Sequence, residues 1–195
     1  MKTLFFDIDT QLDFVYPAGS LYVPNAELIV PRVARLNRYA AAQGWPLIST
    51  SDAHAENDVE FRLWPPHCVS GTQGQTKPLD TVAMPCVRVP RPRSDFALPN
   101  GTQVILEKTS VNCFTNENIS AVLAHYDAQR YVVYGVVTEI CVAFATKGLL
   151  QLGNRVELVS DAVMHLDSVA RDRMLADFVH GGGVITTTNQ VCRVN

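Results

Sequence analysis

Short apolar runs alternate with amphipathic stretches along most of the chain. The short runs are rich in β-branched and aromatic side chains and predict buried strands, whereas apolar positions three to four residues apart predict helices. Residues 25–43, for example, carry an apolar stripe that includes Leu28, Val33 and Leu36. Strands are predicted at residues 4–8, 46–50, 104–106, 131–137, 156–159 and 184–186, and helices at residues 25–43, 116–128, 139–152 and 168–180.

The order of these elements predicts the fold class. Strands that alternate with helices indicate an α/β protein with three αβα layers and a mostly parallel central sheet. A length of 195 residues suits one domain, residues 1–195. The alternation is interrupted at residues 52–100, which are rich in Pro, Gly and charged residues. A loop of this length inside a compact domain is usually functional.

Composition and charge exclude several classes of function. A net charge of −3 gives no reason to expect nucleic acid or an anionic membrane as a partner. No apolar run reaches the roughly 18 residues that a membrane span needs, and the N-terminus lacks the features of a signal peptide. We therefore expect a cytoplasmic protein. The five cysteines are odd in number and irregularly spaced, which argues against a disulfide framework.

One cysteine occupies a position that suits a nucleophile. The predicted strand 131–137 leads into a stretch with helical spacing, and Thr138 is a suitable N-cap, so Cys141 should lie in the first turn of the next helix. The positive end of a helix dipole favours the thiolate. The alternative is a small buried hydrophobic residue, since cysteine often has only that role. No glycine-rich phosphate loop follows the first strand, so a nucleotide-binding site is not supported.

Further reactive side chains follow other predicted strands. Asp7 and Asp9 lie at the end of the first strand, and Lys108 follows the strand at 104–106. Because ligands bind at the carboxyl ends of parallel strands, these side chains should approach Cys141. A lysine favours the thiolate and a carboxylate can accept the thiol proton, so an acid, a lysine and a cysteine form a plausible catalytic set.

The long loop adds candidate metal ligands. Asp52 and His54 come just after the second strand, and Glu60 and His67 follow within the loop. Two imidazoles with one or two carboxylates suit Zn, Fe or Mn. The alternative is that Asp52 caps a turn and both histidines are exposed loop residues.

Taken together, these segments resemble the isochorismatase-like cysteine hydrolases, and among them the nicotinamidase/pyrazinamidase group. The resemblance spans the whole chain in the expected order. It rests on Asp9-x-Gln11-x-Asp13-Phe14, Asp52-x-His54, Glu60, Trp64-Pro65-Pro66-His67-Cys68-Val69-x-Gly71-Thr72-x-Gly74, Lys108-Thr109, Gly135-x-x-Thr138-x-x-Cys141-Val142 and Val159-Ser160-Asp161-Ala162.

The resemblance implies a catalytic triad of Asp9, Lys108 and Cys141. It also implies a cis peptide bond between Val136 and Val137, which would direct the Val137 N–H, with that of Cys141, toward the substrate oxyanion.

The same resemblance makes Asp52, His54, Glu60 and His67 the ligands of one divalent metal ion, Zn ahead of Fe or Mn. The fourth position varies in the family between His and Glu, and Asp58 is the alternative to Glu60.

Phe14 and Trp64 would stack on a flat substrate ring, unless they are ordinary core or lid aromatics. Asp13 matches a position that orients the turn, and Asp7 lies outside the shared pattern. The implied reaction is hydrolysis of a small carboxamide, nicotinamide foremost and pyrazinamide also, by a homo-oligomer. The alternatives are an amidase acting on carbamoyl, ureido or maleamate-type substrates, and a non-catalytic metal-binding protein.

Overall fold

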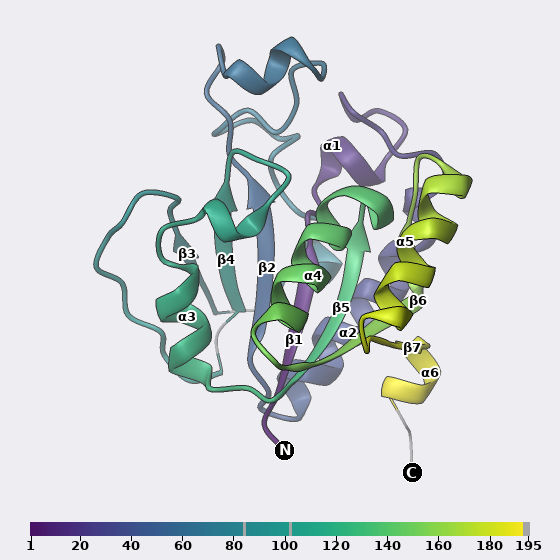
Figure 1. The fold of residues 1–195 in the computed structure, drawn as a ribbon. Coiled ribbons are helices and arrows are strands. Elements are labelled where there is room, and N and C mark those ends of the chain that lie inside the picture. Colours follow the sequence, from purple (N-terminus) through teal and green to yellow (C-terminus); the bar gives the residue numbers. More distant parts are fainter. Residues whose placement is uncertain (84, 102, 193–195) are drawn as a thin grey trace.

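A single sheet of seven parallel strands forms the centre of the molecule (Figure 1), in the order β3-β4-β2-β1-β5-β6-β7. The computed structural model describes residues 1–83, 85–101 and 103–192. Met84, Thr102 and residues 193–195, which fall within the predicted domain 1–195, lie outside the described residues. The strands are β1 (Thr3–Ile8), β2 (Leu47–Asp52), β3 (Cys86–Val89), β4 (Gln103–Lys108), β5 (Arg130–Val136), β6 (Arg155–Met164) and β7 (Val184–Thr186).

Helices cover both faces of the sheet, which confirms the predicted α/β class with three layers. One face packs against α2 (Val30–Ala42) and α6 (Thr188–Val191). The other packs against α3 (Ile119–Tyr126), α4 (Ala143–Gln151) and α5 (Ser168–His180). The short α1 (Leu12–Val15) follows the carboxyl end of β1. Single turns occur at Ala26–Leu28, Val59–Arg62, Leu79–Thr81, Cys113–Thr115 and Thr138–Val142.

The central strand β1 is buried along its whole length. Successive side chains of a strand point to opposite faces, so Leu4, Phe6 and Ile8 join the core under α3, α4 and α5, while Phe5 packs on the side of α2. Such two-sided burial explains the almost continuous apolar run in the sequence.

Three predicted segments differ from the structure, and one of them is the strand expected at 156–159, which extends over Arg155–Met164. The helix expected at 25–43 divides into a turn at Ala26–Leu28 and α2. Pro31 has no N–H for a helical hydrogen bond and therefore fits only the first turn of a helix, so α2 begins next to it. Residues 52–100 were expected to be a loop, yet they contain β3. This strand has only four residues and lies at the edge of the sheet, so its sequence pattern is weak.

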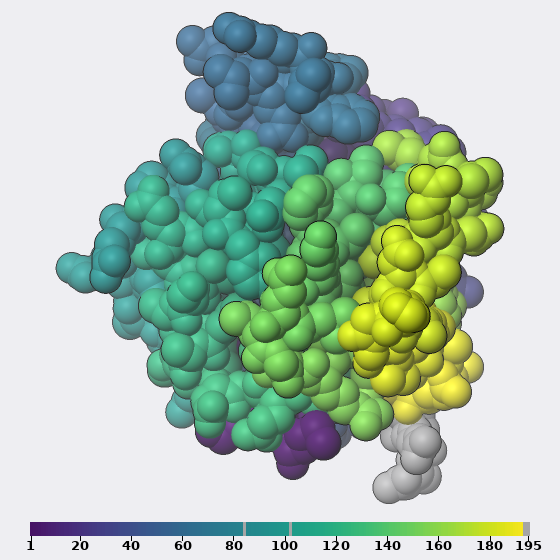
Figure 2. Space-filling view, viewed as in Figure 1, coloured from purple at the N-terminus to yellow at the C-terminus, as the bar shows by residue number. Residues whose placement is uncertain are grey.

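The segment after β2 rises above the carboxyl edge of the sheet. Figure 2 shows its residues near 55–65, in blue, as a lobe on the body of the molecule. Below this lobe, the carboxyl ends of β1, β2, β4 and β5 lie side by side. Among the described helices, none combines the length and apolarity that crossing a bilayer requires.

Candidate active site

Asp9 lies in the turn that follows β1 and is 1% exposed. Its φ is 50°, in the left-handed region that non-glycine residues rarely occupy. Thr50 of β2 holds it from two directions: the Thr50 Oγ1 accepts from the Asp9 N–H at 3.1 Å and donates to Asp9 Oδ1 at 2.6 Å. These bonds leave Oδ2 directed toward the centre of the site.

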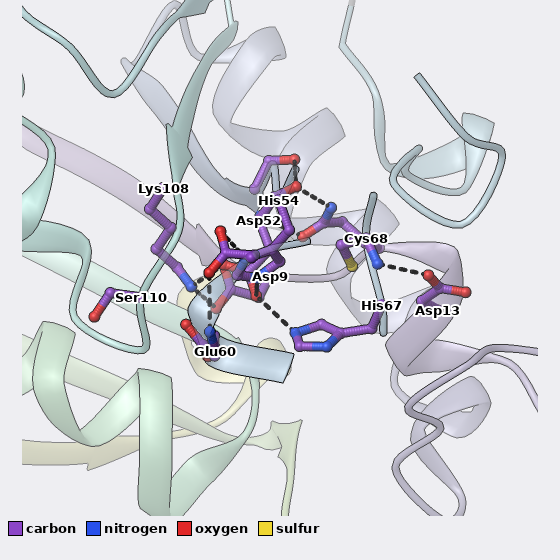
Figure 3. Close-up of polar contacts among 12 residues, drawn as sticks. Asp9, Asp13, Asp52, His54, Glu60, His67, Cys68, Lys108 and Ser110 are labelled. Atoms are coloured by element: carbon purple, nitrogen blue, oxygen red, sulfur yellow. Dashed lines mark hydrogen bonds and ion pairs between the residues drawn. The ribbon is translucent and has the colours of Figure 1, made fainter. Parts of the chain in front are cut away.

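Lys108 links two carboxylates in the interior (Figure 3). It ends β4, where the strand register places it opposite Asp52, the last residue of β2. The Lys108 Nζ lies 2.9 Å from Asp9 Oδ2 and donates to Asp52 Oδ1. Burial alone would lower the pKa of Lys108, but Asp52 and Asp9 raise it well above its ordinary value. The lysine therefore stays charged.

The two carboxylates respond differently to this environment. Burial raises the pKa of Asp9; Lys108 opposes this effect and the charge of Asp52 adds to it. Burial would also raise the pKa of Asp52, but Lys108 and the neighbouring histidines hold it far below its ordinary value. Asp9 is therefore the carboxylate better able to accept a proton.

Cys141 lies in a π-helical turn, Thr138–Val142, that precedes α4. The prediction that Thr138 caps this helix is wrong, because the Thr138 hydroxyl donates to the Met164 carbonyl at 2.9 Å and thereby joins the turn to β6. Cys141 is 8% exposed, and burial raises the pKa of its thiol well above the ordinary value despite Lys108. The expectation that the helix end favours a resting thiolate is therefore also wrong. The charge of the nearby Asp9 carboxylate adds to this rise in the pKa of the thiol.

The end of β5 directs the chain into this turn. Gly135 has φ +121°, and a Cβ there would lie 2.1 Å from the Ile8 carbonyl oxygen, so only glycine fits beside β1. The cis peptide bond expected between Val136 and Val137 is present.

A second cluster lies beside the first. Asp52, His54 and His67 are buried, and each has a ligand atom within 4.8 Å of those of the other two. Asp52 Oδ2 lies 3.8 Å from His54 Nε2 and 3.7 Å from His67 Nε2 (Figure 3). Asp52 thus faces Lys108 with one oxygen and the histidines with the other.

The ring nitrogens of the two histidines are arranged as they would be around a metal ion. The His67 Nδ1 lies 2.8 Å from the Pro65 carbonyl oxygen, which only accepts, so Nδ1 carries the proton and the Nε2 lone pair faces the cluster. The His54 Nε2 is buried, and no group in the described parts of the chain hydrogen bonds with it. An unpaired buried nitrogen is costly in apolar surroundings, and a cation would pair with it. Three protein ligands with open positions are typical of catalytic sites.

Glu60 and Asp58 lie near this cluster but outside it. Glu60 lines the adjoining pocket and does not belong to the three-residue group, so its assignment as the fourth ligand stays a prediction. The Asp58 Oδ2 lies 3.1 Å from His54 Nδ1, on the side of the ring away from Asp52. Asp58 therefore orients His54, as acidic residues behind ligating histidines often do.

A pocket joins the two clusters. It encloses about 370 Å³ including its open mouth, and its walls include Cys141, Asp52 and His67 together with the predicted aromatic residues Phe14 and Trp64. Phe14 is buried and its ring packs 5.3 Å from that of His67, while Trp64 is half-buried. The structure thus gathers the thiol, the candidate metal ligands and two aromatic rings around one cavity.

The sequence pattern of the isochorismatase domain matches residues 85–190, more than half of the chain. The chain belongs to the isochorismatase family. The nicotinamidase of Escherichia coli (strain K12) is 26% identical over 180 residues, covering 79% of each chain. An N-carbamoylsarcosine amidase of Arthrobacter sp. is 24% identical over 153 residues, 76% of this chain and 54% of that protein. The crystal structure of the pyrazinamidase of Pyrococcus horikoshii in complex with zinc has a TM-score of 0.79 and 27% identity, covering 96% of this chain and 99% of that one.

This isochorismatase-family protein is accordingly an amidohydrolase, an enzyme that cleaves carboxamide C–N bonds. Its predicted site residues are brought together, except that Glu60 lies outside the metal cluster. The sequence reasoning missed the apolar walls of the pocket, which come from five residues of separate segments: Leu21, Val23, Val111, Ile140 and Leu166. It also missed Phe61, whose ring packs 5.2 Å from that of His54. No local pattern marks these positions.

Proposed function

We propose that this amidohydrolase is a nicotinamidase that converts nicotinamide and water to nicotinate and ammonia, and that it also hydrolyses pyrazinamide. The observation that supports this most strongly is the pocket, which the Cys141 thiol, the cluster residues Asp52 and His67, and two aromatic side chains all line. A flat ring between Phe14 and Trp64 would place its amide near the thiol and its ring nitrogen near the cluster.

The proposed reaction begins with Asp9, whose carboxylate lies close enough to the Cys141 thiol to raise the pKa of the thiol. Because burial keeps the thiol protonated, Asp9 accepts its proton as sulfur attacks the amide carbonyl. Lys108 stabilises the charges on Asp9 and sulfur. The N–H groups of Val137 and Cys141 would stabilise the oxyanion, and one such donor typically contributes about 3 kcal/mol. Asp9 then gives its proton to the departing ammonia, and water hydrolyses the thioester.

Asp52, His54 and His67 would hold the divalent metal ion, for which zinc is our first choice. When bound, it supplies a Lewis acid that takes a ring nitrogen as a ligand. Within the chain, Asp58 orients His54 and the Pro65 carbonyl orients His67, so both imidazoles are fixed before any substrate binds.

A panel of amides tests this proposal, with ammonia release as the measurement. Nicotinamide and pyrazinamide should both be cleaved. Benzamide has the same ring size and amide but no ring nitrogen, so kcat/KM should fall by up to about 10⁴-fold. Chelation should abolish the preference for nicotinamide. Trp64→Ala should weaken nicotinamide binding by roughly 1–3 kcal/mol through lost packing. Equal kcat/KM for benzamide and nicotinamide would refute the proposed substrate.

A second candidate is an amidase for N-carbamoyl or other acyclic amides, which the similarity to an N-carbamoylsarcosine amidase supports. The two aromatic side chains in the pocket favour a ring-shaped substrate over this alternative. Strong preference for an acyclic ureido substrate in the same panel would favour the second candidate. That the enzyme is cytoplasmic and homo-oligomeric stays a prediction.

A further inference from the structure

A second buried ion pair lies beside the catalytic turn, and the proposed reaction does not use it. Asp7 of β1 is completely buried, and the Lys77 Nζ lies 3.0 Å from its Oδ2. Lys77 comes from the long segment after the metal cluster, seventy residues away along the chain, and is itself buried. Neither residue belongs to the motifs that carry the family resemblance.

The carboxylate of Asp7 is saturated with donors. Its Oδ2 accepts from Asn37 at 3.0 Å and from Ser49 at 3.1 Å in addition to Lys77, and its Oδ1 accepts from Thr10 at 2.8 Å. Four donors thus hold a carboxylate that has about four acceptor positions, and Asp7 is not among the residues that line the pocket. Asp7 is therefore suited to hold its partners in place.

One of these partners adjoins the catalytic base. Thr10 directly follows Asp9 and is completely buried, and its hydroxyl both donates to Asp7 and accepts from Lys77. A hydroxyl fixed from two sides also fixes the backbone that carries it. Asp9 has a φ of 50°, a conformation that persists only where the surrounding structure enforces it.

The backbone of the Lys77 segment supports the other side of the same turn. The Leu12 N–H donates to the Thr76 carbonyl at 2.8 Å, and the Gln11 side-chain amide donates to the Gln75 carbonyl at 2.8 Å. Lys77 thus ends a strap, residues 74–77, that runs along the turn after β1.

We propose that Lys77 and Asp7 form a positioning pair that fixes the turn at Asp9 and thereby holds its carboxylate against the Cys141 thiol. The pair touches neither substrate nor reacting atoms. This inference rests on the roles proposed above for Asp9 and Cys141.

The main test is the double variant Asp7→Asn/Lys77→Met. Lys77→Met alone leaves a buried carboxylate without its cation and can prevent folding; the double variant removes both charges. With the Lys77 bond to Thr10 lost and the acceptor at position 7 uncharged, kcat for the best amide substrate should fall about 10²-fold, the effect typical of a reacting group misplaced by roughly 1 Å. KM should change little, because the pocket walls remain.

Glu157→Gln is the matched control for stability. Glu157 is buried and pairs with Arg130 at 2.6 Å, at the amino end of the sheet and far from the site. The Glu157→Gln variant should be less stable than the parent and have the same kcat. A double variant with the kcat of the parent, or one whose kcat loss is matched by Glu157→Gln, would show that the pair has only a structural role.

A readout without substrate separates this inference from the proposed function. Iodoacetamide should label Cys141 at a rate that depends on Asp9 as proton acceptor, and the exposed Cys86 provides an internal reference. Asp9→Asn gives the labelling ratio of a site without its base. In the double variant, the ratio of the Cys141 labelling rate to the Cys86 labelling rate should shift toward the value measured for Asp9→Asn. This result is expected even if the parent hydrolyses no nicotinamide. A ratio equal to that of the parent would overturn the inference.

Discussion

Replacing Lys108 with Met should destabilise the protein more than replacing any exposed lysine. Lys108 is completely buried between two carboxylates, 2.9 Å from Asp9 Oδ2 and in contact with Asp52 Oδ1. Methionine fills nearly the same volume, so the change creates little cavity and removes mainly the charge. It leaves two buried carboxylates side by side without their common cation.

The magnitude follows from that loss. Removing one partner of a buried ion pair typically lowers the free energy of unfolding by about 3–5 kcal/mol. For a chain of 150–250 residues, 1 kcal/mol corresponds to about 2–4 °C, so the melting temperature should fall by about 6–20 °C. Lys2→Met is the control, because Lys2 pairs with Asp127 at 2.9 Å in a mostly exposed position. That pair should contribute at most about 1 kcal/mol.

The pH dependence gives the sharper check. In the parent, Lys108 holds the pKa of Asp52 below its ordinary value, so this carboxylate contributes stability above the unfolded pKa of about 3.9 that is lost as the pH falls. Without Lys108, burial and mutual repulsion should raise both carboxyl pKa values. The folded variant then binds more protons than the unfolded chain, and its stability falls as the pH rises.

Urea unfolding with a chelator present measures this difference. The deficit of Lys108→Met relative to the parent should be largest at neutral pH and should shrink between about pH 7 and pH 5, as the carboxyl groups become protonated. A deficit below about 1 kcal/mol at neutral pH, or one that grows on acidification, would refute this account of the site.

Three further variants test other parts of the molecule. Cys141→Ala should abolish amide hydrolysis and keep its fold and metal content; turnover within about tenfold of the parent would rule out covalent catalysis. His54→Ala should lose the divalent metal, and full occupancy by elemental analysis would exclude this site. Glu157→Gln should be less stable than the parent at neutral pH, and this difference should shrink as the pH falls. Although burial raises the pKa of Glu157, Arg130 and Arg155 lower it by more, so the ionised side chain stabilises the parent. Acid removes that contribution from the parent only, because the variant does not have it. A deficit that does not narrow would argue against that pairing.

The convergence of Asp9, Lys108 and Cys141 could be predicted from the sequence because each follows a recognisable strand. Parallel strands place their carboxyl ends at one edge, so the order of elements alone brings distant residues together. The register of β2 and β4 then sets Asp52 beside Lys108. The resemblance to a known family added the cis peptide bond, which composition and periodicity do not indicate.

Other features depend on contacts that no local pattern encodes. In the π-helical turn, the Thr138 hydroxyl donates to the carbonyl of Met164 in β6, twenty-six residues further along the chain. The apolar walls at Val111 and Leu166 come from separate loops and have no periodicity. Lys77 resembles any loop lysine in the sequence, and only the fold shows that it reaches Asp7.

The two outer strands of the sheet limit how copies of this chain can associate. The edge strand β3 has four residues and lies between Pro85 and Pro90, and β7 at the opposite edge has three residues. Short edge strands offer few free N–H groups to a further strand, and at β3 the flanking prolines supply none. A stable assembly would therefore use helical faces of the molecule. The two short edge strands disfavour sheets that continue from one subunit to the next, and such sheets are prone to aggregate.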